Sequence, residues 1–599
     1  MISAAIGRDM HFAIHGANWI MSNGRDKISS TQRTRVKSNV ADCSSNPDAQ
    51  SGHVDTFVRE HLPPQDLWPV MSTHGLAELE YPMRLNAAEE LLDSHIAQGH
   101  GASPCLRTEN FTWTYQQLLD HANRMANLLV NWGLAPGERV LLRDANTPML
   151  VASWFAVLKA GGIAVTTMIQ LRAHELTAIL NKARTKYAIC AREHAEDVYK
   201  AQGSAPVLEK IIVYDHPTGL ELPALLADQS AGFPNRFTSQ NDPALIAFSS
   251  GTTGEPKATV HFHRDLLAVC DTFSKHVLNP TPQDIFCGSP PLAFTFGLGG
   301  LLLFPMRVGA STLLLPRVSA EILLKAIERH GCTTCFTAPT LYRSMVELVP
   351  RFNLSSLTKC VSAGEKLPRE VFDSWQKATG LQIIDGIGST EMLHIFISAA
   401  GKDIRPGATG KPVPGYEALV LDETGKPVPA NTVGHLAVRG PTGCRYLDAP
   451  DQQQKYVQNG WNITGDLYRV DDDGYFWYEG RTDDLIVSAG YKISALEVES
   501  VLMAHSKISL CAVIGAPHHD RGHIVKAFVV LKTGISGDDL LRRELQEYMK
   551  AQLAPYKYPR AIEFVSELPH SATGKLQRSR LREQERNKAL DSEAKADGQ

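Results

Sequence analysis

Residues 245–257 read Leu-Ile-Ala-Phe-Ser-Ser-Gly-Thr-Thr-Gly-Glu-Pro-Lys, a short apolar run followed by a loop of glycines and hydroxyl side chains. The run Leu245–Phe248 has the length and apolarity of a buried strand. After it, Gly251 and Gly254 allow the backbone to approach an anion closely, and Lys257 supplies a positive charge that offsets phosphate. The hydroxyl donors of the loop are Ser249, Ser250, Thr252 and Thr253. The stretch therefore predicts a strand that leads into a phosphate-binding loop.

The spacing of this loop differs from that of the Walker A motif. Walker A requires a lysine directly after the second glycine, whereas Glu-Pro stands between Gly254 and Lys257. A flexible linker is the alternative interpretation, and the strand that enters the loop argues against it. We expect a helix from about His263, whose N-terminus can help to bind the anion.

Strand and helix patterns alternate from about residue 80. The segment Thr114-Tyr-Gln-Gln117 is typical of a capping box at a helix start, and apolar side chains then recur at helical spacing. These positions are Leu118, Ala122, Met125, Ala126 and Leu129. Short apolar runs typical of strands follow at Val140–Leu142, Ile163–Val165, Tyr187–Cys190 and Ile211–Tyr214. Strands separated by helices predict an α/β fold with parallel βαβ-type sheets.

The composition and the pattern of predicted helices and strands change twice toward the C-terminus. After about residue 405, frequent proline and glycine and short hairpin-like strands predict a β-rich subdomain. Beyond Arg481, helix and strand patterns predict a small, separate α+β domain. We expect a polar, partly disordered N-terminal extension over 1–70, a large domain over 71–482, a small C-terminal domain over 483–586 and a tail over 587–599.

The composition fits a soluble globular protein without a charged surface for nucleic acid. The 599 residues carry a formal net charge of −4, and 43% hydrophobic and 21% charged residues are ordinary values. The most apolar stretch, Pro290–Met306, is interrupted by glycines and a proline and is short for a bilayer span, so we expect a loop and a buried helix and no membrane. Ten cysteines without disulfide-type spacing indicate a reducing compartment, and we expect the cytoplasm.

Six further segments combine glycine with hydroxyl, acidic or basic side chains. The segments are Ser362-Ala-Gly-Glu-Lys366, Asp385-Gly-Ile-Gly-Ser-Thr-Glu391, Thr464-Gly-Asp466, Gly480-Arg-Thr-Asp-Asp484, Ser488-Ala-Gly-Tyr-Lys-Ile493 and Ser571-Ala-Thr-Gly-Lys-Leu-Gln-Arg578. Together with the loop they resemble the adenylate-forming superfamily of acyl-CoA synthetases, nonribosomal adenylation domains and luciferases. Matching segments run from roughly Tyr81 to Arg582.

The resemblance implies that the large domain binds ATP and Mg²⁺. The catalytic residues that it implies are Lys575, Thr390, Glu391 and Lys257. Of these, Glu391 would hold Mg²⁺, a hard cation that prefers oxygen ligands. The residues implied to bind ATP or AMP are Ser249, Ser250, Gly251, Thr252, Thr253, Gly254, Gly364, Glu365, Asp385, Gly386, Ile387, Thr390, Asp466 and Arg481. Ile387 departs from the usual tyrosine, so adenine would stack there on an aliphatic side chain.

The resemblance also implies a mobile C-terminal domain and a coenzyme A channel. Asp483 falls at the hinge about which the small domain rotates between the two half-reactions of the family. The channel for the thiol arm would be formed by Gly490, Tyr491 and Lys492. Many relatives have lysine at position 487, where this chain has valine. The resemblance therefore does not say which residue makes the contact of that lysine in the second half-reaction.

The acid pocket is implied by the segments around Phe296 and His394. The pocket residues are Phe294, Phe296, Gly297, His394 and Ile395. The segment 385–396 resembles benzoate-CoA ligases. The segments His53-Val-Asp-Thr-Phe57 and Tyr81-Pro-Met-Arg-Leu-Asn86, with Pro291–Gly300, look most like their 2-aminobenzoate branch. A flat ring suits a slot with aromatic walls. His394 is either an acceptor for an ortho substituent or a core histidine, and the sequence leaves both interpretations open.

The reaction implied is acid plus ATP plus coenzyme A to acyl-CoA, AMP and diphosphate through an acyl-adenylate. We expect an aromatic acid, 2-aminobenzoate or a related benzoate, as the substrate. The alternatives are a medium-chain or cinnamate-like acid, loading of a carrier protein, a luciferase-like oxygenase, or a non-catalytic nucleotide-binding protein. Homodimerisation is left open.

Overall fold

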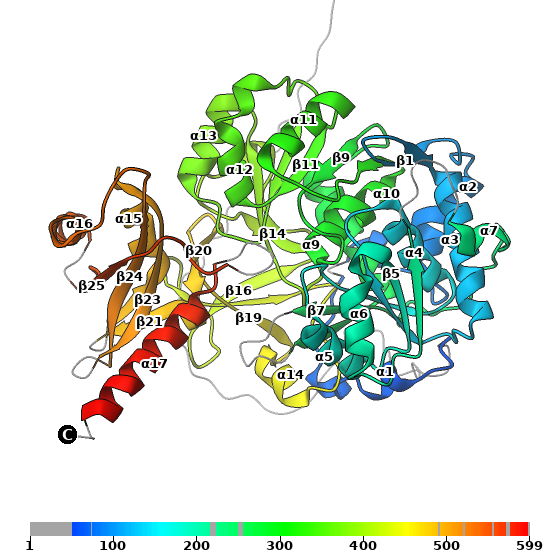
Figure 1. Cartoon of the computed structure of the whole chain (residues 1–599), viewed down its shortest axis with the longest axis horizontal. Helices are drawn as coiled ribbons and strands as arrows, with labels where there is room; N and C mark the ends of the chain where they lie inside the picture. The colour runs from blue at the N-terminus through cyan, green and yellow to red at the C-terminus, as the bar shows by residue number, and fades with distance from the viewer. Residues whose placement is uncertain are drawn as a thin grey trace, which may run out of the picture. The chain divides into compact units, whose positions relative to one another are not determined.

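The computed structural model describes residues 51–73, 75–215, 223–249, 256–488, 491–518, 522–553, 556–570 and 576–596. Within these ranges, three larger sheets form before residue 482, and two smaller sheets follow in the C-terminal module (Figure 1). The α/β class with a small C-terminal domain, predicted from the sequence, is confirmed.

The first sheet has the strand order β6-β5-β3-β4-β7-β8, and its neighbours are parallel except for the β7–β8 pair. Its strands are β3 (Arg139–Arg143), β4 (Ile163–Thr166), β5 (Tyr187–Ala191), β6 (Lys210–Tyr214), β7 (Pro243–Ser249) and β8 (Lys257–Phe262). Its helices are α3 (Tyr115–Asn131), α4 (Pro148–Lys159), α5 (Ala173–Ala183), α6 (Ala195–Gln202) and α8 (His263–Val269). Alternate residues of β3 point into two different hydrophobic cores. Val140 and Leu142 belong to the core that contains α3 and α4, whereas Leu141 belongs to the core that contains α5 and α6.

The second sheet has the order β15-β14-β13-β12-β11-β9-β10-β1-β2. Its strands are β1 (Pro104–Arg107), β2 (Thr112–Thr114), β9 (Ile285–Gly288), β10 (Ser311–Leu313), β11 (Thr334–Thr337), β12 (Lys359–Ser362), β13 (Ile383–Gly388), β14 (Ile395–Ser398) and β15 (Lys411–Pro412). One face shares the core of α3 and α4, and the other packs against α11 (Ala320–His330), α12 (Pro339–Val346) and α13 (Arg369–Thr379), which lie together in Figure 1. Helices α3 and α4 therefore share one hydrophobic core with residues of both sheets.

The segment after residue 405 forms an antiparallel sheet, as predicted. Its strands are β16 (Glu417–Leu421), β17 (Gly434–Arg439), β18 (Val457–Gln458), β19 (Trp461–Val470) and β20 (Phe476–Arg481), with helix α14 (Pro450–Tyr456) beside them in the sequence. This sheet supplies the predicted ribose-binding residues, because Asp466 and Arg481 are register partners on β19 and β20.

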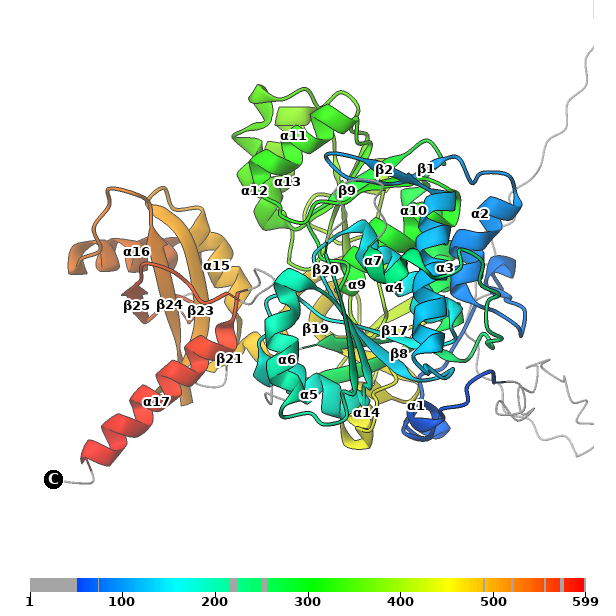
Figure 2. The same cartoon turned by 45° about the vertical axis from the view of Figure 1, so that its right-hand side comes forward.

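The C-terminal module has two sheets and three helices in its described part. Its elements are β21 (Leu485–Ser488), β22 (Tyr491–Ser494), α15 (Ala495–Met503), β23 (Ile508–His518), β24 (Gly522–Leu531), α16 (Asp539–Gln552), β25 (Ala561–Phe564) and α17 (Arg578–Ala596). Strands β23, β24 and β25 lie side by side (Figure 2), antiparallel and then parallel. The predicted α+β character of this module is confirmed.

Helix α3 illustrates how local sequence specifies an element. The Thr114 side chain accepts a hydrogen bond from the Gln117 backbone N–H, and the Gln117 side chain accepts one from the Thr114 N–H, which completes the predicted capping box. The apolar positions predicted from helical spacing are all fully buried: Leu118, Ala122, Met125, Ala126 and Leu129. The cap starts the helix, and the buried stripe fixes it to the core.

Residues 51–70, which the sequence analysis placed in the extension, pack against the large domain instead. The buried Arg139 pairs with Asp55 at 2.6 Å and lies over the Phe57 ring of α1 (Phe57–Glu60). Val58 is also buried, because it belongs to the core beneath α5 and α6. Packed structure therefore begins by residue 51, and the extension as predicted was too long.

The apolar stretch at Pro290–Met306 forms short helical segments, α9 (Thr295–Leu298) and α10 (Phe304–Val308) with a π-helical turn between them. In the part of the chain that the structure describes, no helix combines the length and the apolarity that crossing a bilayer requires.

Candidate active site

The predicted phosphate loop connects two antiparallel strands. Strand β7 ends at Ser249 and β8 begins at Lys257, and these two residues are register partners. The predicted ligands between them lie outside the described residues: Ser250, Gly251, Thr252, Thr253 and Gly254. The helix predicted from His263 is α8, but β8 separates it from the loop. Because the Asp265 carboxylate already accepts the Phe262 N–H at this helix start, the expected contribution of the α8 N-terminus to anion binding is not supported.

The two charged residues predicted for the phosphate side meet on one buried tyrosine, Tyr446. Lys257 Nζ lies 5.5 Å from the centroid of the Tyr446 ring, and the Tyr446 hydroxyl donates a hydrogen bond of 2.6 Å to Glu391 Oε1. Burial and the nearby Glu391 carboxylate raise the pKa of Tyr446 far above its usual range, so the phenol stays protonated. The sequence motifs predicted Lys257 and Glu391 but gave no signal for Tyr446.

A residue of β8 forms a hydrogen bond with the backbone beside Glu391. His261 Nε2 donates to the Thr390 carbonyl oxygen at 2.9 Å. Burial lowers the pKa of His261 to about 4, so the ring is neutral. Leu393 has a φ of 69°, and this turn brings the chain from β13 into β14. The predicted phosphate and metal residues are therefore fixed by a strand that begins at Lys257.

A magnesium ion fits the donor set at Glu391. The hydrogen bond from Tyr446 engages only Oε1 among the described residues, which leaves Oε2 for a cation. Mg²⁺ commonly binds through one or two carboxylates together with substrate phosphates and water. One carboxylate that shares Tyr446 with Lys257 matches that pattern.

The predicted adenine side lies where β12 and β13 end. Gly364 has a φ of 89°, which glycine tolerates, and Glu365 accepts a hydrogen bond of 2.6 Å from the Thr340 hydroxyl. Asp385 is half-buried, its enclosed Oδ1 has no hydrogen-bond partner among the described residues, and burial of the carboxyl raises its pKa to about 7. A side chain at Gly386 would collide with Ile395, at 2.7 Å from its Cγ2.

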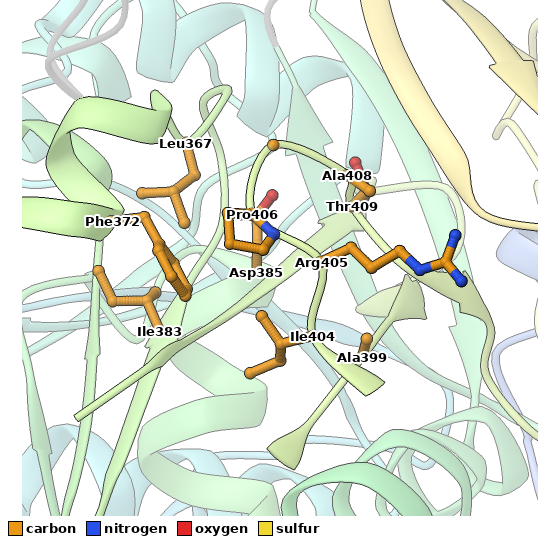
Figure 3. Close-up of a pocket in the computed structure, with 11 residues that line it drawn as sticks. Leu367, Phe372, Ile383, Asp385, Ala399, Ile404, Arg405, Pro406, Ala408 and Thr409 are labelled. Carbon is orange, nitrogen blue, oxygen red and sulfur yellow. The ribbon is translucent and has the colours of Figure 1, made fainter. Parts of the chain in front are cut away.

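A small cavity lies beside Asp385 (Figure 3). Its apolar wall consists of Leu367, Phe372, Ile383 and Ile404, and the Arg405 side chain extends away from that wall. Its volume of about 10 Å³ is enough for one water molecule and far too small for a nucleotide. The cavity therefore does not mark the ATP site.

The predicted ribose residues contact each other directly. Arg481 Nη1 donates to Asp466 Oδ1 at 3.0 Å and to the Thr464 carbonyl oxygen at 3.3 Å. Gly465 has a φ of 77°, and a Cβ added at this position would lie 3.2 Å from Arg481 Nη2. The Thr-Gly-Asp turn thus presents one carboxylate and one guanidinium together at the end of the β19–β20 ladder.

The predicted hinge leads into an ionic network of the C-terminal module. Asp483 belongs to the short 3-10 turn Thr482–Asp484. The next carboxylate, Asp484, binds Arg582 at 2.6 Å and Arg578 at 3.3 Å, and Arg578 also binds Glu499 at 2.6 Å. The end of the turn is therefore tied to the start of α17. Lys575 and Gly490 lie outside the described residues, and Tyr491 and Lys492 begin strand β22.

Two of the predicted acid-side residues, Phe296 and His394, belong to an aromatic cluster centred on His394. The His394 ring has centroid distances of 4.5 Å to Phe304, 5.6 Å to Phe273, 5.7 Å to Phe296 and 6.5 Å to Phe336. Burial lowers the pKa of His394 to about 3, so the ring is neutral. Its Nδ1 has no hydrogen-bond partner among the described residues, and its Nε2 lies 3.4 Å from the Phe296 carbonyl oxygen.

Glycines near this cluster leave room for the close packing of its neighbours. A Cβ on Gly299 would lie 2.2 Å from His394 Cδ2, and one on the predicted pocket residue Gly297 would lie 2.0 Å from the Pro291 carbonyl oxygen. Phe294 precedes α9, and Ile395 is buried where β14 begins. The structure brings Phe296 and His394 together as predicted, and it adds Gly299, Phe273, Phe304 and Phe336.

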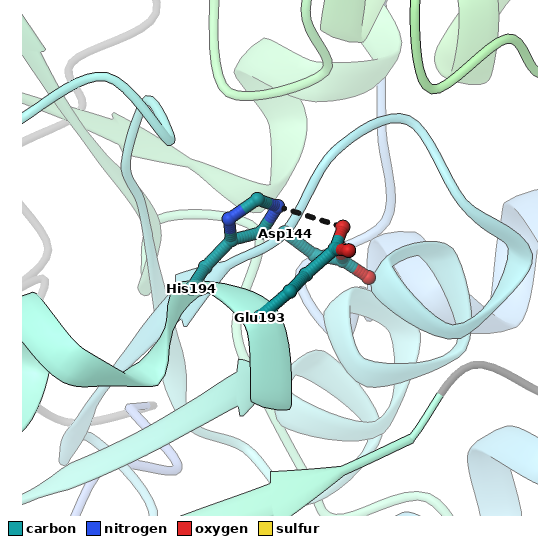
Figure 4. A group of neighbouring side chains, drawn as sticks. All are labelled: Asp144, Glu193 and His194. Carbon is teal, nitrogen blue, oxygen red and sulfur yellow. Dashed lines mark ion pairs between the residues drawn. The ribbon is translucent and has the colours of Figure 1, made fainter.

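A second group of polar side chains lies away from these motifs. Asp144, Glu193 and His194 bring potential ligand atoms within 4.8 Å of one another (Figure 4). Asp144 Oδ2 accepts hydrogen bonds from Thr147 at 2.6 Å and Tyr214 at 2.7 Å, and His194 pairs with Glu193 at 3.2 Å. These contacts tie Asp144 to the N-cap residue of α4 and to β6.

The comparison with known proteins agrees with the motifs. The chain matches the AMP-binding enzyme family over residues 94–445 and the AMP-binding enzyme C-terminal domain over residues 497–575. A benzoate–CoA ligase from Thauera aromatica is 36% identical over 84% of this chain and 97% of its own length.

Two solved structures are similar over most of the chain. An anthranilate CoA ligase in complex with anthranoyl-AMP has a TM-score of 0.81 and 36% identity, and covers 86% of this chain and 100% of its own. A benzoate CoA ligase from Burkholderia xenovorans LB400 has a TM-score of 0.75 and 33% identity, with 83% and 100% covered. The predicted adenylate-forming superfamily and benzoate-CoA ligase subgroup are confirmed. The chain belongs to the AMP-binding enzyme family.

Proposed function

We propose that this chain is an ATP-dependent aryl acid–CoA ligase that forms acyl-CoA, AMP and diphosphate through an acyl-adenylate. Its family membership and its similarity to benzoate and anthranilate ligases support the proposal. The observation that carries it is the meeting of Lys257 and Glu391 on one buried tyrosine at the base of the phosphate loop. An acid-activating enzyme needs a cation and a metal-binding carboxylate beside the same triphosphate.

In the first half-reaction, a carboxylate oxygen of the acid attacks the α-phosphorus of ATP. The new P–O bond forms as the bond to the bridging oxygen breaks, and diphosphate leaves. Lys257 and Thr390 would face the phosphates, Lys575 would bridge the carboxylate and the α-phosphate, and Asp466 with Arg481 would hold the ribose. Mg²⁺ bound at Glu391 would neutralise phosphate charge.

In the second half-reaction, the coenzyme A sulfur attacks the carbonyl carbon of the acyl-adenylate. The C–O bond to AMP breaks, AMP leaves with its electron pair, and the thiol proton is lost. We propose that the small domain turns about Asp483 between the two steps, which withdraws Lys575 and presents Gly490, Tyr491 and Lys492 to the thiol arm. The domains would then extend from 51 to 482 and from 483 to 586.

We propose a benzoate-type acid, with 2-aminobenzoate as the first candidate. The neutral His394 and the phenylalanines around it form a wall suited to a flat ring. His394 Nδ1 is available to exchange a hydrogen bond with an ortho substituent. We also propose the cytoplasm as the location.

One substrate screen tests this proposal. Benzoate, 2-aminobenzoate, salicylate, cinnamate and hexanoate are each incubated with ATP, Mg²⁺ and coenzyme A, and AMP release is measured. We expect the fastest release with a benzoate-type acid, and no AMP release when coenzyme A is left out. Preference for hexanoate, or an absence of AMP with every acid, would contradict the proposal.

The role of Lys575 is tested by separating the half-reactions. Lys575→Ala should slow formation of the acyl-adenylate far more than transfer from a preformed acyl-adenylate to coenzyme A. Equal losses in both steps would remove the assignment.

A further inference from the structure

We infer that Tyr446 is a positioning residue for the first half-reaction, because its side chain contacts both Lys257 and Glu391 and orients each through a different group. This inference rests on the proposed function. Tyr446 belongs to none of the motifs from which the ATP-binding residues were predicted. Its contacts, however, join the two residues that bear the opposite charges of the site.

The Tyr446 backbone is fixed against the strand that begins at Lys257. Leu447 N donates to the Ala258 carbonyl oxygen at 2.8 Å, and Val260 N donates to the Arg445 carbonyl oxygen at 2.9 Å. Tyr446 N donates to the fully buried Gln453 Oε1 at 2.9 Å. The tyrosine therefore cannot shift without disturbing the start of β8.

The neighbouring residue provides a second anchor. Arg445 pairs with Asp265 at 2.8 Å, and neither side chain is exposed to solvent. The Arg445 guanidinium also lies 4.1 Å from the centroid of the Phe262 ring. A buried, hydrogen-bonded ion pair costs several kcal/mol to break, so the segment that carries Tyr446 is rigid.

The Tyr446 side chain acts differently on the two charges. Its hydroxyl is a donor to the Glu391 carboxylate at 2.6 Å, which fixes the rotation of that group. Its ring presents a π-face to the Lys257 ammonium at 5.5 Å, within the usual range of a cation–π contact. The two charged side chains, both described, form no ion pair with each other.

This separation matters because a direct Lys257–Glu391 pair would neutralise both groups. The ammonium would then be engaged by the carboxylate rather than by phosphate, and the carboxylate would be a weaker ligand for Mg²⁺. The face of the ring engages Lys257, and the hydroxyl binds Oε1 of Glu391, which leaves Oε2 open to a cation among the described residues. Tyr446 thus keeps both charges available for Mg²⁺–ATP.

The decisive experiment compares Tyr446→Phe and Tyr446→Leu in the full chain. Tyr446→Phe retains the ring and loses the hydrogen bond to a charged group, which should raise the Mg²⁺ concentration for half-maximal diphosphate release about tenfold. Direct Mn²⁺ binding in the presence of ATP, measured by electron paramagnetic resonance of the free ion, should weaken by a similar factor. Tyr446→Leu also loses the ring, so the KM for ATP should rise in addition.

The matched control is Tyr115→Phe. The Tyr115 hydroxyl is also buried and donates to a carbonyl oxygen, that of Ala310 at 2.8 Å, but it lies among different elements. Its loss should leave the Mg²⁺ dependence and Mn²⁺ binding unchanged. Transfer of a preformed acyl-adenylate to coenzyme A should stay within about twofold of wild type in all three variants.

A second comparison distinguishes positioning from general damage. In the Glu391→Gln background, adding Tyr446→Phe should change Mn²⁺ binding by less than about twofold, because residues that act through one contact are not additive. Wild-type Mn²⁺ binding in Tyr446→Phe, or equal losses in both half-reactions, would overturn the inference. If wild-type enzyme released no AMP with any acid, the proposed function would fail, whereas Mn²⁺ and ATP binding would still test Tyr446.

Discussion

The proposed phosphate side and the proposed acid side of this site are held by different kinds of contact. On the phosphate side, Lys257 and Glu391 are fixed by a hydrogen bond, a cation–π contact and the paired strands below them. On the acid side, the neutral His394 is held almost entirely by packing against phenylalanine rings. Under the proposed function, this difference predicts that binding of the triphosphate depends on placing individual charges, whereas selection of the acid depends on shape. Four substitutions test this contrast.

The largest effect is expected beneath the phosphate side. Arg445→Met removes one partner of the buried pair with Asp265 and leaves an uncompensated charge, so the free energy of unfolding should fall by about 3–5 kcal/mol. Urea unfolding measures this change. Arg439→Met is the control, because Arg439 pairs with Glu417 at the surface, where such pairs contribute about 0–1 kcal/mol. Similar losses in the two variants would contradict the assigned rigidity.

The next effect is on catalysis. Glu391→Gln keeps the shape of the side chain but removes its charge, and acyl-adenylate formation should slow by about 10²–10³-fold, comparable to the loss of one electrostatic stabiliser. Single-turnover release of diphosphate is the measurement. Glu417→Gln, at the surface pair with Arg439, should be as active as wild type. Full activity of Glu391→Gln would remove that residue from the site.

A smaller effect concerns pH and the acid side. His394 titrates at about 3 when folded and near 6.5 when unfolded, so the unfolded chain binds the proton first as pH falls. Between pH 7 and pH 5 this histidine should therefore cost about 2 kcal/mol of stability. In His394→Leu the fall over that interval, measured by urea unfolding, should be smaller by this amount. Replacing the exposed His174 by leucine should leave the pH dependence as in wild type.

The smallest effect should separate the two sides of the site. Phe296→Ala opens space in the aromatic cluster, so kcat/KM for the preferred ring acid should fall about tenfold while bulkier acids gain, in the range typical of pocket changes by apolar groups. The KM for ATP should stay unchanged and serves as the internal control. An unaltered acid profile would place Phe296 outside the pocket.

The sequence predicted those parts of the molecule that follow from short-range patterns. The capping box at Thr114, the buried stripe of α3 and the strand before the phosphate loop each depend on neighbouring residues, and the structure contains all of them. Lys257 and Glu391 could also be predicted, because the motifs around them resemble a known signature. Both charges lie against the same tyrosine in the fold.

What could not be predicted depends on contacts between distant segments. Tyr446 becomes part of the site through its pairing with β8, and Gly299 through its close approach to His394 in the turn before β14. No periodicity marks either residue. Strand β8 was missed because its residues follow a proline and precede a helix that the pattern did predict. The hinge network around Asp484 likewise joins segments far apart in the chain.

The buried pair of Arg445 and Asp265 also has an evolutionary consequence. Each residue compensates the charge of the other, in a place where water cannot do so. A mutation of one residue alone gives an unstable protein, whereas replacement of both by well-packed apolar residues need not lower the stability. Among descendants of this chain, the two positions should therefore change together or not at all, although 180 residues separate them in the sequence.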